Sequence, residues 1–244
     1  MKNFIKIFVA ITFLVMIVVN ALANGLPLNG ILTGAVSDNY TNLFTPIGMT
    51  FSIWGLIYVL LAVYVFYQFK SKKILIEKIG LYFSISSLAN ALWIFCWHYD
   101  LIGLSILFMF IILLSLLKIN NYLLKEELNR QEKFLIALPF NIYFGWITVA
   151  TIANIIVFLV SLGFDGFNTF YIIGFLILGA ILGSLGIFKT KSFAYGLVLI
   201  WAYLGILIKH TSLNGFYSEY PSIIFVTIFS LVVFISSLFC LKKN

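Results

Sequence analysis

Long apolar runs alternate with short polar segments along the whole 244-residue chain. A membrane hydrocarbon core about 30 Å thick needs roughly 20 apolar residues per crossing helix, and the chain contains a series of runs near that length. We expect eight membrane-spanning helices, at residues 4–23, 47–69, 80–98, 101–118, 135–161, 169–188, 192–209 and 221–241. The pattern therefore predicts an all-α integral membrane protein.

The positions of the cations test this order of helices, because Lys and Arg concentrate in the cytoplasmic segments of membrane proteins. With eight helices and the N-terminus inside, all but one of the 15 Lys and Arg residues fall on the cytoplasmic side, and the exception is Lys209. A wrong number of helices in the middle of the chain would destroy this alternation. We expect a multipass protein of the inner or plasma membrane, surrounded by membrane lipids, with both termini in the cytoplasm.

The first apolar run has a second interpretation. Lys2, Lys6, the apolar stretch after them and the sequence Ala21-Leu22-Ala23 also resemble a signal peptide with its cleavage site. Cleavage would leave seven helices with the same loops on the same sides, so the charge pattern does not decide. We favour a retained helix, because a multipass protein seldom needs a cleaved signal when its first helix can start insertion.

Composition and charge agree with a protein whose main solvent is lipid. Hydrophobic residues make up 63% of the chain and charged residues 9%, against about 25% charged in soluble domains. The net charge of +7 does not indicate nucleic-acid binding, because the cations lie between apolar runs. Every ionisable Asp, Glu, Lys, Arg and His lies in a loop or at a helix end, which argues against an ion-coupled pump or an intramembrane metalloenzyme.

Neither a metal site nor a disulfide is expected. Two histidines are too few for the three or four ligands of a zinc site, and Cys96 and Cys240 are placed near opposite membrane faces. Gly179, Gly183 and Gly186 share one face of the sixth predicted helix, where G-x-x-x-G spacing lets backbones approach closely. We favour packing within the chain at this face, with homodimer contact as the alternative.

Aromatic and asparagine residues form stripes on three of the predicted helices. They are Phe51, Trp54 and Tyr58 on helix 47–69, Asn90 and Trp93 on helix 80–98, and Tyr143, Trp146 and Asn154 on helix 135–161. An asparagine that faced lipid would leave its amide without partners, so the stripes should face the bundle interior. At 1.5 Å per residue, Trp54, Asn90 and Asn154 all lie about 10 to 12 Å below the outer interface, where they can line one cavity.

Two interpretations of these rings are left open. The deep tryptophans Trp54, Trp93 and Trp146 either pack against the asparagines or stack on a ligand. Trp97 and Tyr99 lie nearer the headgroups, where an interfacial aromatic belt explains them as well as a pocket does.

The same residues resemble the motifs of the tryptophan-rich sensory protein family, the TspO/MBR or peripheral benzodiazepine receptor group. Phe51-Ser-Ile-Trp54-Gly-Leu-Ile-Tyr58 is similar to the F-x-x-W-x-x-x-Y pattern of the second helix of that family, and Asn90-Ala-Leu-Trp93 to the N-x-x-W pattern of the third. Tyr143, Trp146, Ala150 and Asn154 have the spacing of its fifth-helix pattern.

The resemblance covers roughly residues 1 to 160 and implies a five-helix module at residues 1–162, followed by a three-helix extension at residues 163–244. It also implies a cavity that is capped by the loop between the first two helices and accepts planar hydrophobic ligands such as porphyrins or haem, with no cofactor required. The loop at residues 24–46 has the length and the glycines of a lid, although an ordinary exterior connection explains it equally well. Unlike the family, this loop contains no tryptophan.

The leading hypothesis for function is a membrane-embedded binder, sensor or carrier of a planar hydrophobic ligand, with the eight stripe residues lining its site. Aromatic faces would stack on the ligand and the amides would fix its orientation. The alternative is a transporter of small solutes or lipids, without ion coupling, whose path runs between the first five helices and the last three. A third class, an intramembrane enzyme, is opposed by the missing acid–base groups.

Overall fold

The computed structural model describes residues 2–26 and 28–243 as a bundle of long helices. The helices are α1 (Lys2–Gly25), α2 (Thr33–Asn39), α3 (Ile53–Lys70), α4 (Ile74–His98), α5 (Ile102–Leu123), α6 (Arg130–Glu132), α7 (Leu138–Ser161), α8 (Thr169–Thr190), α9 (Phe193–Thr211) and α10 (Pro221–Lys243). Two 3-10 turns, Leu28–Gly30 and Gly48–Ser52, and a π-helical turn, Lys133–Ala137, complete the helical structure. Eight segments of the described chain are long and apolar enough to cross a membrane, which confirms the predicted number.

Two of the helices extend five or six residues beyond the apolar runs that predicted them. α4 begins at Ile74 instead of residue 80, and α5 ends at Leu123 instead of residue 118. Hydropathy locates only the stretch that needs lipid, whereas a helix continues as long as its backbone hydrogen bonds and side-chain packing are satisfied. The added turns of α4 carry Lys78, as expected for a helix end that leaves the hydrocarbon.

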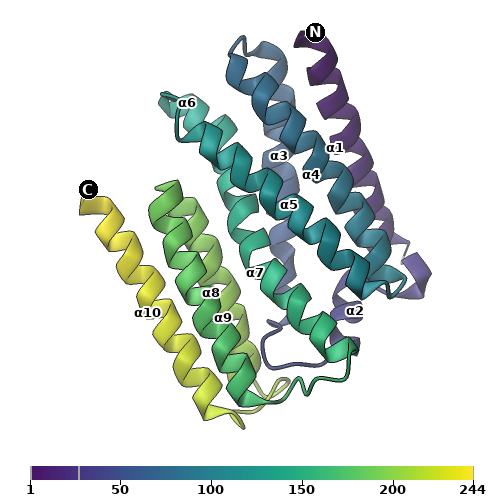
Figure 1. The fold of residues 1–244 in the computed structure, drawn as a ribbon, viewed down its shortest axis with the longest axis vertical. Coiled ribbons are helices and arrows are strands. Elements are labelled where there is room, and N and C mark those ends of the chain that lie inside the picture. The colour runs from purple at the N-terminus through teal and green to yellow at the C-terminus, as the bar shows by residue number, and fades with distance from the viewer. Residues whose placement is uncertain (1, 27, 244) are drawn as a thin grey trace.

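α7 is the central helix of the bundle. We call α1, α3, α4, α5 and α7 the five-helix part and α8, α9 and α10 the three-helix part. α7 contacts α3 and α5 in the first and α8 and α9 in the second, and Figure 1 shows it between the two groups. Eight passes bring both chain ends toward the same end of the bundle, the upper end in Figure 1. We call this the cationic end, because most Lys and Arg residues lie in or beside its loops at residues 71–73, 124–129 and 191–192.

The exterior of the bundle is apolar and its interior is aromatic. Phe66 on α3 and Phe170 on α8 are 76% and 79% exposed, and exposed apolar side chains of this size and number indicate a lipid surface. Inside, Tyr64, Phe83 and Phe140 meet edge to face, with ring centroids 4.8 to 5.6 Å apart. These three rings fix α3, α4 and α7 to one another.

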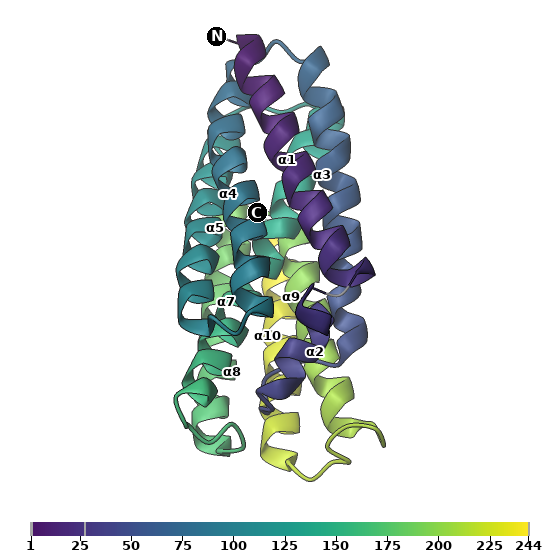
Figure 2. The same cartoon turned by 90° about the vertical axis from the view of Figure 1, so that its right-hand side faces the viewer.

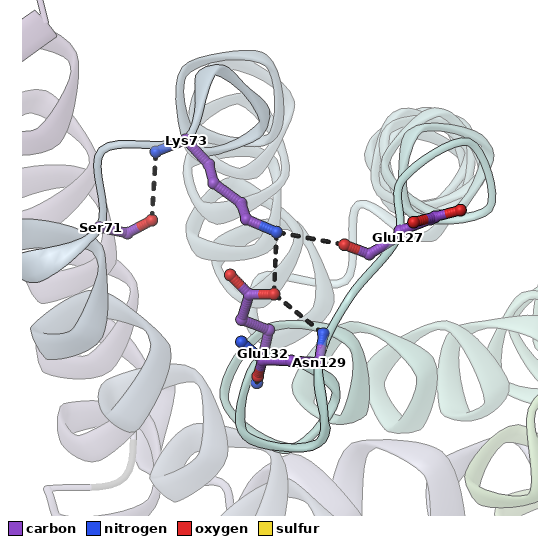
Figure 3. A network of polar contacts seen from close by, with 5 residues as sticks. All are labelled: Ser71, Lys73, Glu127, Asn129 and Glu132. Carbon is purple, nitrogen blue, oxygen red and sulfur yellow. Dashed lines mark hydrogen bonds and ion pairs between the residues drawn. The ribbon is translucent and has the colours of Figure 1, made fainter.

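A polar network joins two loops at the cationic end, as Figure 3 shows. The ammonium group of Lys73 lies 2.8 Å from Glu132 Oε2 and donates to the Glu127 carbonyl at 3.2 Å. Glu132 also accepts from the Asn129 amide, while the Asn129 side chain accepts from the Glu132 amide, forming a capping box. The network therefore ties the start of α4 to the turn that leads into α7.

The glycine face of α8 is covered by helices of the same chain. Gly179 lies against the hydroxyl of Tyr203, Gly186 against that of Tyr195, and Gly183 against Phe234. An added methyl group would collide with a side chain at each position. The close backbone approach that the spacing predicts is therefore used inside the chain, between α8 and its neighbours α9 and α10.

Candidate ligand cavity and its lid

Trp54 on α3 lies at the centre of a cluster of aromatic rings. Tyr58 stacks on it with centroids 5.5 Å apart and planes 23° apart. Trp93 lies at 6.3 Å, Tyr143 at 5.9 Å and Trp146 at 6.1 Å, the last nearly perpendicular to Trp54. Helices α3, α4 and α7 thus bring the three predicted stripes together at one depth.

Asn154 on α7 holds one wall of this cluster in place. Its Oδ1 accepts a 2.9 Å hydrogen bond from Trp93 Nε1, and its Nδ2 donates to Ser105 Oγ at 2.9 Å. All three side chains are buried. A buried amide with both ends paired fixes the plane of the Trp93 indole, so the ring presents a defined face to the interior.

Asn90 on α4 forms a second buried amide pair deeper in the bundle. Its Oδ1 accepts from Asn20 Nδ2 at 2.7 Å, and its Nδ2 donates to the Tyr143 hydroxyl at 3.4 Å. Asn20 also donates to the carbonyl of Met16 within its own helix. This pair connects α1, α4 and α7, which confirms that Asn90 faces the interior.

Trp146 differs from its neighbours because its indole N–H is buried and has no hydrogen-bond partner among the described residues. The side chain is 3% exposed and its ring stands edge-on to Phe51, with centroids 5.8 Å apart. Leaving a buried donor unpaired costs about 1 to 3 kcal/mol. The N–H is available to an acceptor that enters the cluster.

A small cavity lies against these rings, between the cluster and the loop that precedes α3. Its lining comprises Thr33, Ser37, Thr45, Pro46, Phe51, Trp54, Trp93, Trp97, Met109, Trp146, Val149, Ala150, Ala153, Asn154 and Val157. None of these residues is charged. Its volume is about 40 Å³, which is room for roughly one water molecule.

A larger groove lies on the other side of Trp54, between α1 and α3. It has a volume of about 350 Å³ and is lined by Ile17, Asn20, Ala21, Asn24, Thr33, Gly34, Phe51, Trp54, Gly55, Tyr58 and Ile94. Thr33, Phe51 and Trp54 belong to both linings, and the rings of Phe51 and Trp54 form a partition between groove and cavity.

The roof of the cavity is part of the loop between α1 and α3, and we call residues 33–46 the lid. Figure 2 shows α2, the first part of the lid, lying across the lower end of the α1 and α4 group. Thr33, Ser37, Thr45 and Pro46 reach the cavity from the lid. Residues 33–46 of the predicted loop are therefore a cover that contains its own helix.

His98 at the end of α4 anchors the first part of the lid. Its Nδ1 donates to the Leu28 carbonyl at 3.0 Å, and its Nε2 then accepts from the Thr33 hydroxyl at 2.9 Å in the neutral imidazole. Trp97 Nε1 donates to the Thr33 carbonyl at 3.1 Å. Farther along, Tyr40 donates to Asp100 at 2.5 Å, and burial, reinforced by this bond, raises the pKa of the Tyr40 hydroxyl to about 12.

The three-helix part anchors the second part of the lid. His210 Nε2 on α9 donates to the Leu43 carbonyl at 2.8 Å, and the Leu43 amide donates to the Gly166 carbonyl at 3.1 Å. Just beyond the lid, the Ile47 amide donates to the Gly205 carbonyl at 3.1 Å. Figure 1 shows α8 to α10 reaching below the other helices, which brings their lower ends beside this segment.

Six of the eight predicted site residues line the cavity or the groove, and two do not. Those lining the cavity or the groove are Phe51, Trp54, Tyr58, Trp93, Trp146 and Asn154, whereas Asn90 and Tyr143 lie behind the rings and support them. Sequence reasoning missed the supporting residues Asn20 and Ser105. Asn20 follows a long apolar run, where an asparagine is read as an ordinary helix-end residue. Ser105 gave no signal because a serine in a membrane helix commonly bonds to the backbone of its own helix.

No group of three or more His, Cys, Asp or Glu side chains in the described part of the chain is arranged to hold a metal ion. Both histidines are instead used to hold the lid. Cys96 is buried and Cys240 is exposed, and both are free thiols.

A protein-family model matches almost the whole chain. The model of the TSPO-like protein family matches residues 6–240, which span all eight membrane-crossing segments. The chain belongs to the TSPO-like protein family. No curated protein and no solved structure gives a significant match. The family match includes the three-helix part of this TSPO-like protein, beyond the residues whose motifs carry the resemblance noted from the sequence.

Proposed function

We propose that this TSPO-like protein binds a planar, largely apolar ligand such as a porphyrin in the cavity beneath the lid, as a membrane-embedded binder, sensor or carrier. The lining supports this proposal with aromatic faces and an amide but no charged group. Such a lining recognises a flat ring system by stacking and by a few directed hydrogen bonds.

The observation that carries the proposal is the unpaired N–H of Trp146. It lies in the cavity lining, is buried, and lacks a partner among the described residues, while the neighbouring Trp93 N–H is paired with Asn154. A ligand with a carbonyl or carboxylate oxygen would remove this penalty of about 1 to 3 kcal/mol on binding. The ligand should therefore carry an acceptor at the edge of its planar system.

The volume of the cavity sets a condition on binding. A ligand site of drug-like size takes about 300 to 1,000 Å³, whereas this cavity holds about 40 Å³. The groove behind Trp54 holds about 350 Å³, and Thr33, Phe51 and Trp54 line both spaces. We propose that a rotation of Trp54 joins them when the ligand binds.

Stacking on the macrocycle fits the lining better than coordination of a haem iron. No imidazole or thiolate belongs to the lining, so the usual axial ligands of haem proteins are not supplied there except for the thioether of Met109. Metal-free protoporphyrin is therefore the better test compound. We assign no catalytic step to the site.

The alternative path between the five-helix and three-helix parts is less well supported. Gly145 on α7 lies so close to the Tyr195 carbonyl that a methyl group there would sit 2.9 Å from it. Thr148 and Tyr195 share a 3.0 Å hydrogen bond across the same contact. Close packing of this kind favours a fixed contact between the two parts over a solute path.

The proposal is tested by titrating the purified protein with protoporphyrin and following both tryptophan quenching and the porphyrin Soret band. We expect saturable binding that is weakened by Trp54→Phe and by Trp146→Phe. Trp146→Phe keeps an aromatic ring but removes the N–H, so it should lose more affinity for ligands with an edge acceptor than for ligands without one. Tyr171→Phe, on the exposed outer end of α8, is the matched control. Binding that is identical in all four proteins, or absent at micromolar ligand, would refute the proposal.

A further inference from the structure

A second hollow lies far from the lid, where α7 meets α8 and α9 at the cationic end; Figure 1 shows this seam between the two groups of helices. It holds about 320 Å³ and is lined by the end of α5, the first turns of α7 and the turn between α8 and α9. Its lining residues are Asn120, Leu123, Leu124, Glu126, Leu128, Lys133, Ala137, Leu138, Asn141, Thr190, Lys191, Ser192, Phe193 and Ala194.

An apolar groove continues from this hollow toward the middle of the bundle. It holds about 410 Å³ between α3, α7 and α9, and its lining residues are Ser52, Ile53, Leu56, Leu138, Ile142, Ala194, Leu197, Val198 and Trp201. Leu138 and Ala194 belong to both linings, so the hollow and the groove are neighbours. The indole N–H of Trp201 is already bonded to the Thr50 carbonyl at 2.9 Å, which leaves its ring as an apolar surface.

The polar end of this combined surface favours an anion. Lys133 and Lys191 come to it from two different parts of the bundle, and Glu126 is the single carboxylate in the lining. Asn120 and Asn141 add amide groups that can donate hydrogen bonds to phosphate oxygens.

The apolar end favours a hydrocarbon chain that enters from the lipid. Leu56 and Leu197 form its rim and are 50% and 58% exposed on the membrane side. From Ala194 to Trp201 the groove follows about 10 Å of α9, at 1.5 Å per residue. A surface that is cationic at the membrane interface and apolar below it has the charge and polarity profile of an anionic phospholipid.

We propose that this surface binds an anionic glycerophospholipid, with the phosphate between Lys133 and Lys191 and one acyl chain along Leu197 toward Trp201. We favour an anionic lipid because a zwitterionic headgroup would place its own cationic group beside Lys133 and Lys191. The lipid would contact α5, α7 and the α8–α9 turn together, and so would join the five-helix and three-helix parts. This site is independent of the cavity beneath the lid.

The test uses the delipidated full-length protein in detergent, with bound lipid counted by native mass spectrometry during titration. Phosphatidylglycerol is compared with phosphatidylcholine of the same acyl chains. We expect phosphatidylglycerol to bind more tightly, and the double variant Lys133→Gln/Lys191→Gln to lose about tenfold in affinity for it. Lys70→Gln/Lys72→Gln removes the same charge from exposed positions at the same end of the bundle and should bind normally.

Two further variants test whether the acyl chain of the lipid lies in the groove. Leu197→Asn makes the rim of the groove polar, and Ala194→Phe fills the junction between hollow and groove, so both should weaken binding with the lysines intact. Having two variants keeps the test valid if one does not fold, as judged by circular dichroism and gel filtration. Equal binding of the two lipids, unchanged affinity in the lysine variant, or unchanged affinity in the folded groove variants would overturn the proposal. Complete competition by glycerol phosphate, which has no acyl chain, would also overturn it.

Discussion

The indole N–H of Trp93 donates to Asn154 Oδ1 over 2.9 Å, and the same amide donates to Ser105, so one asparagine pairs polar groups from α4 and α5 inside a membrane bundle. Trp146, about two turns away on the helix of Asn154, has no such partner among the described residues. The two tryptophans thus differ in hydrogen bonding: the Trp93 N–H is paired with Asn154, whereas the Trp146 N–H has no partner among the described residues.

Asn154→Leu should destabilise the protein. It leaves Trp93 Nε1 without its acceptor, and a buried unpaired polar group costs about 1 to 3 kcal/mol. For a chain of this length we expect the midpoint of thermal unfolding in detergent to fall by about 2 to 4 °C for each kcal/mol lost. Asn214→Leu, in the exposed loop after α9, is the control and should leave the midpoint unchanged. Equal midpoints for the two variants would show that the Asn154 amide has no net structural role.

Trp54 should control access from the groove to the cavity. Ala150 lines the cavity but not the groove, so a cysteine introduced there, after replacement of Cys96 and Cys240, reports on access. We expect Ala150→Cys to react slowly with a small methanethiosulfonate reagent and much faster when Trp54→Ala is added. Phe66→Ala removes a ring of the same helix that faces lipid and should not change the rate. The same rate in all three backgrounds would rule out Trp54 as the partition.

The sequence allowed the bundle and the wall of the cavity to be predicted, but not the way the lid is held. Eight apolar runs determine eight helices, and an asparagine inside such a run must find an interior partner, which is why Asn90 and Asn154 could be placed. The identity of their partners depends on three-dimensional packing. Asn20 pairs with Asn90 across 70 positions, and His210 bonds to Leu43 across 167, separations that no local pattern encodes.

The two histidines should hold opposite parts of the lid. His98→Leu removes the hydrogen bonds to Leu28 and Thr33, so deuterium uptake should rise at residues 28–36. His210→Leu removes the bond to Leu43, so uptake should rise at residues 41–47 instead. Hydrogen exchange with mass spectrometry measures both, and each variant is the control for the other. A rise across the whole lid in both variants would mean that it opens as one unit and is not anchored separately.

The turn Gly48–Ser52, which precedes α3, packs against α9. This contact should depend on the absence of a side chain at Gly205. A methyl group there would collide with the Thr50 side chain, and the Ile47 amide bonds to the Gly205 carbonyl beside it. Gly205→Ala should therefore destabilise the protein by about 1 to 3 kcal/mol, through the displacement of the turn that carries Phe51. Gly174→Ala on α8 meets no atom within 4 Å and should be neutral or stabilising by up to about 1 kcal/mol, because alanine favours helix over glycine. Thermal unfolding in detergent distinguishes the two, and Gly205→Ala combined with Thr50→Ala, which removes both the hydroxyl and the methyl group from the collision, should recover part of the loss. A Gly205→Ala protein as stable as the parent would mean that the turn can move away from α9 at no cost.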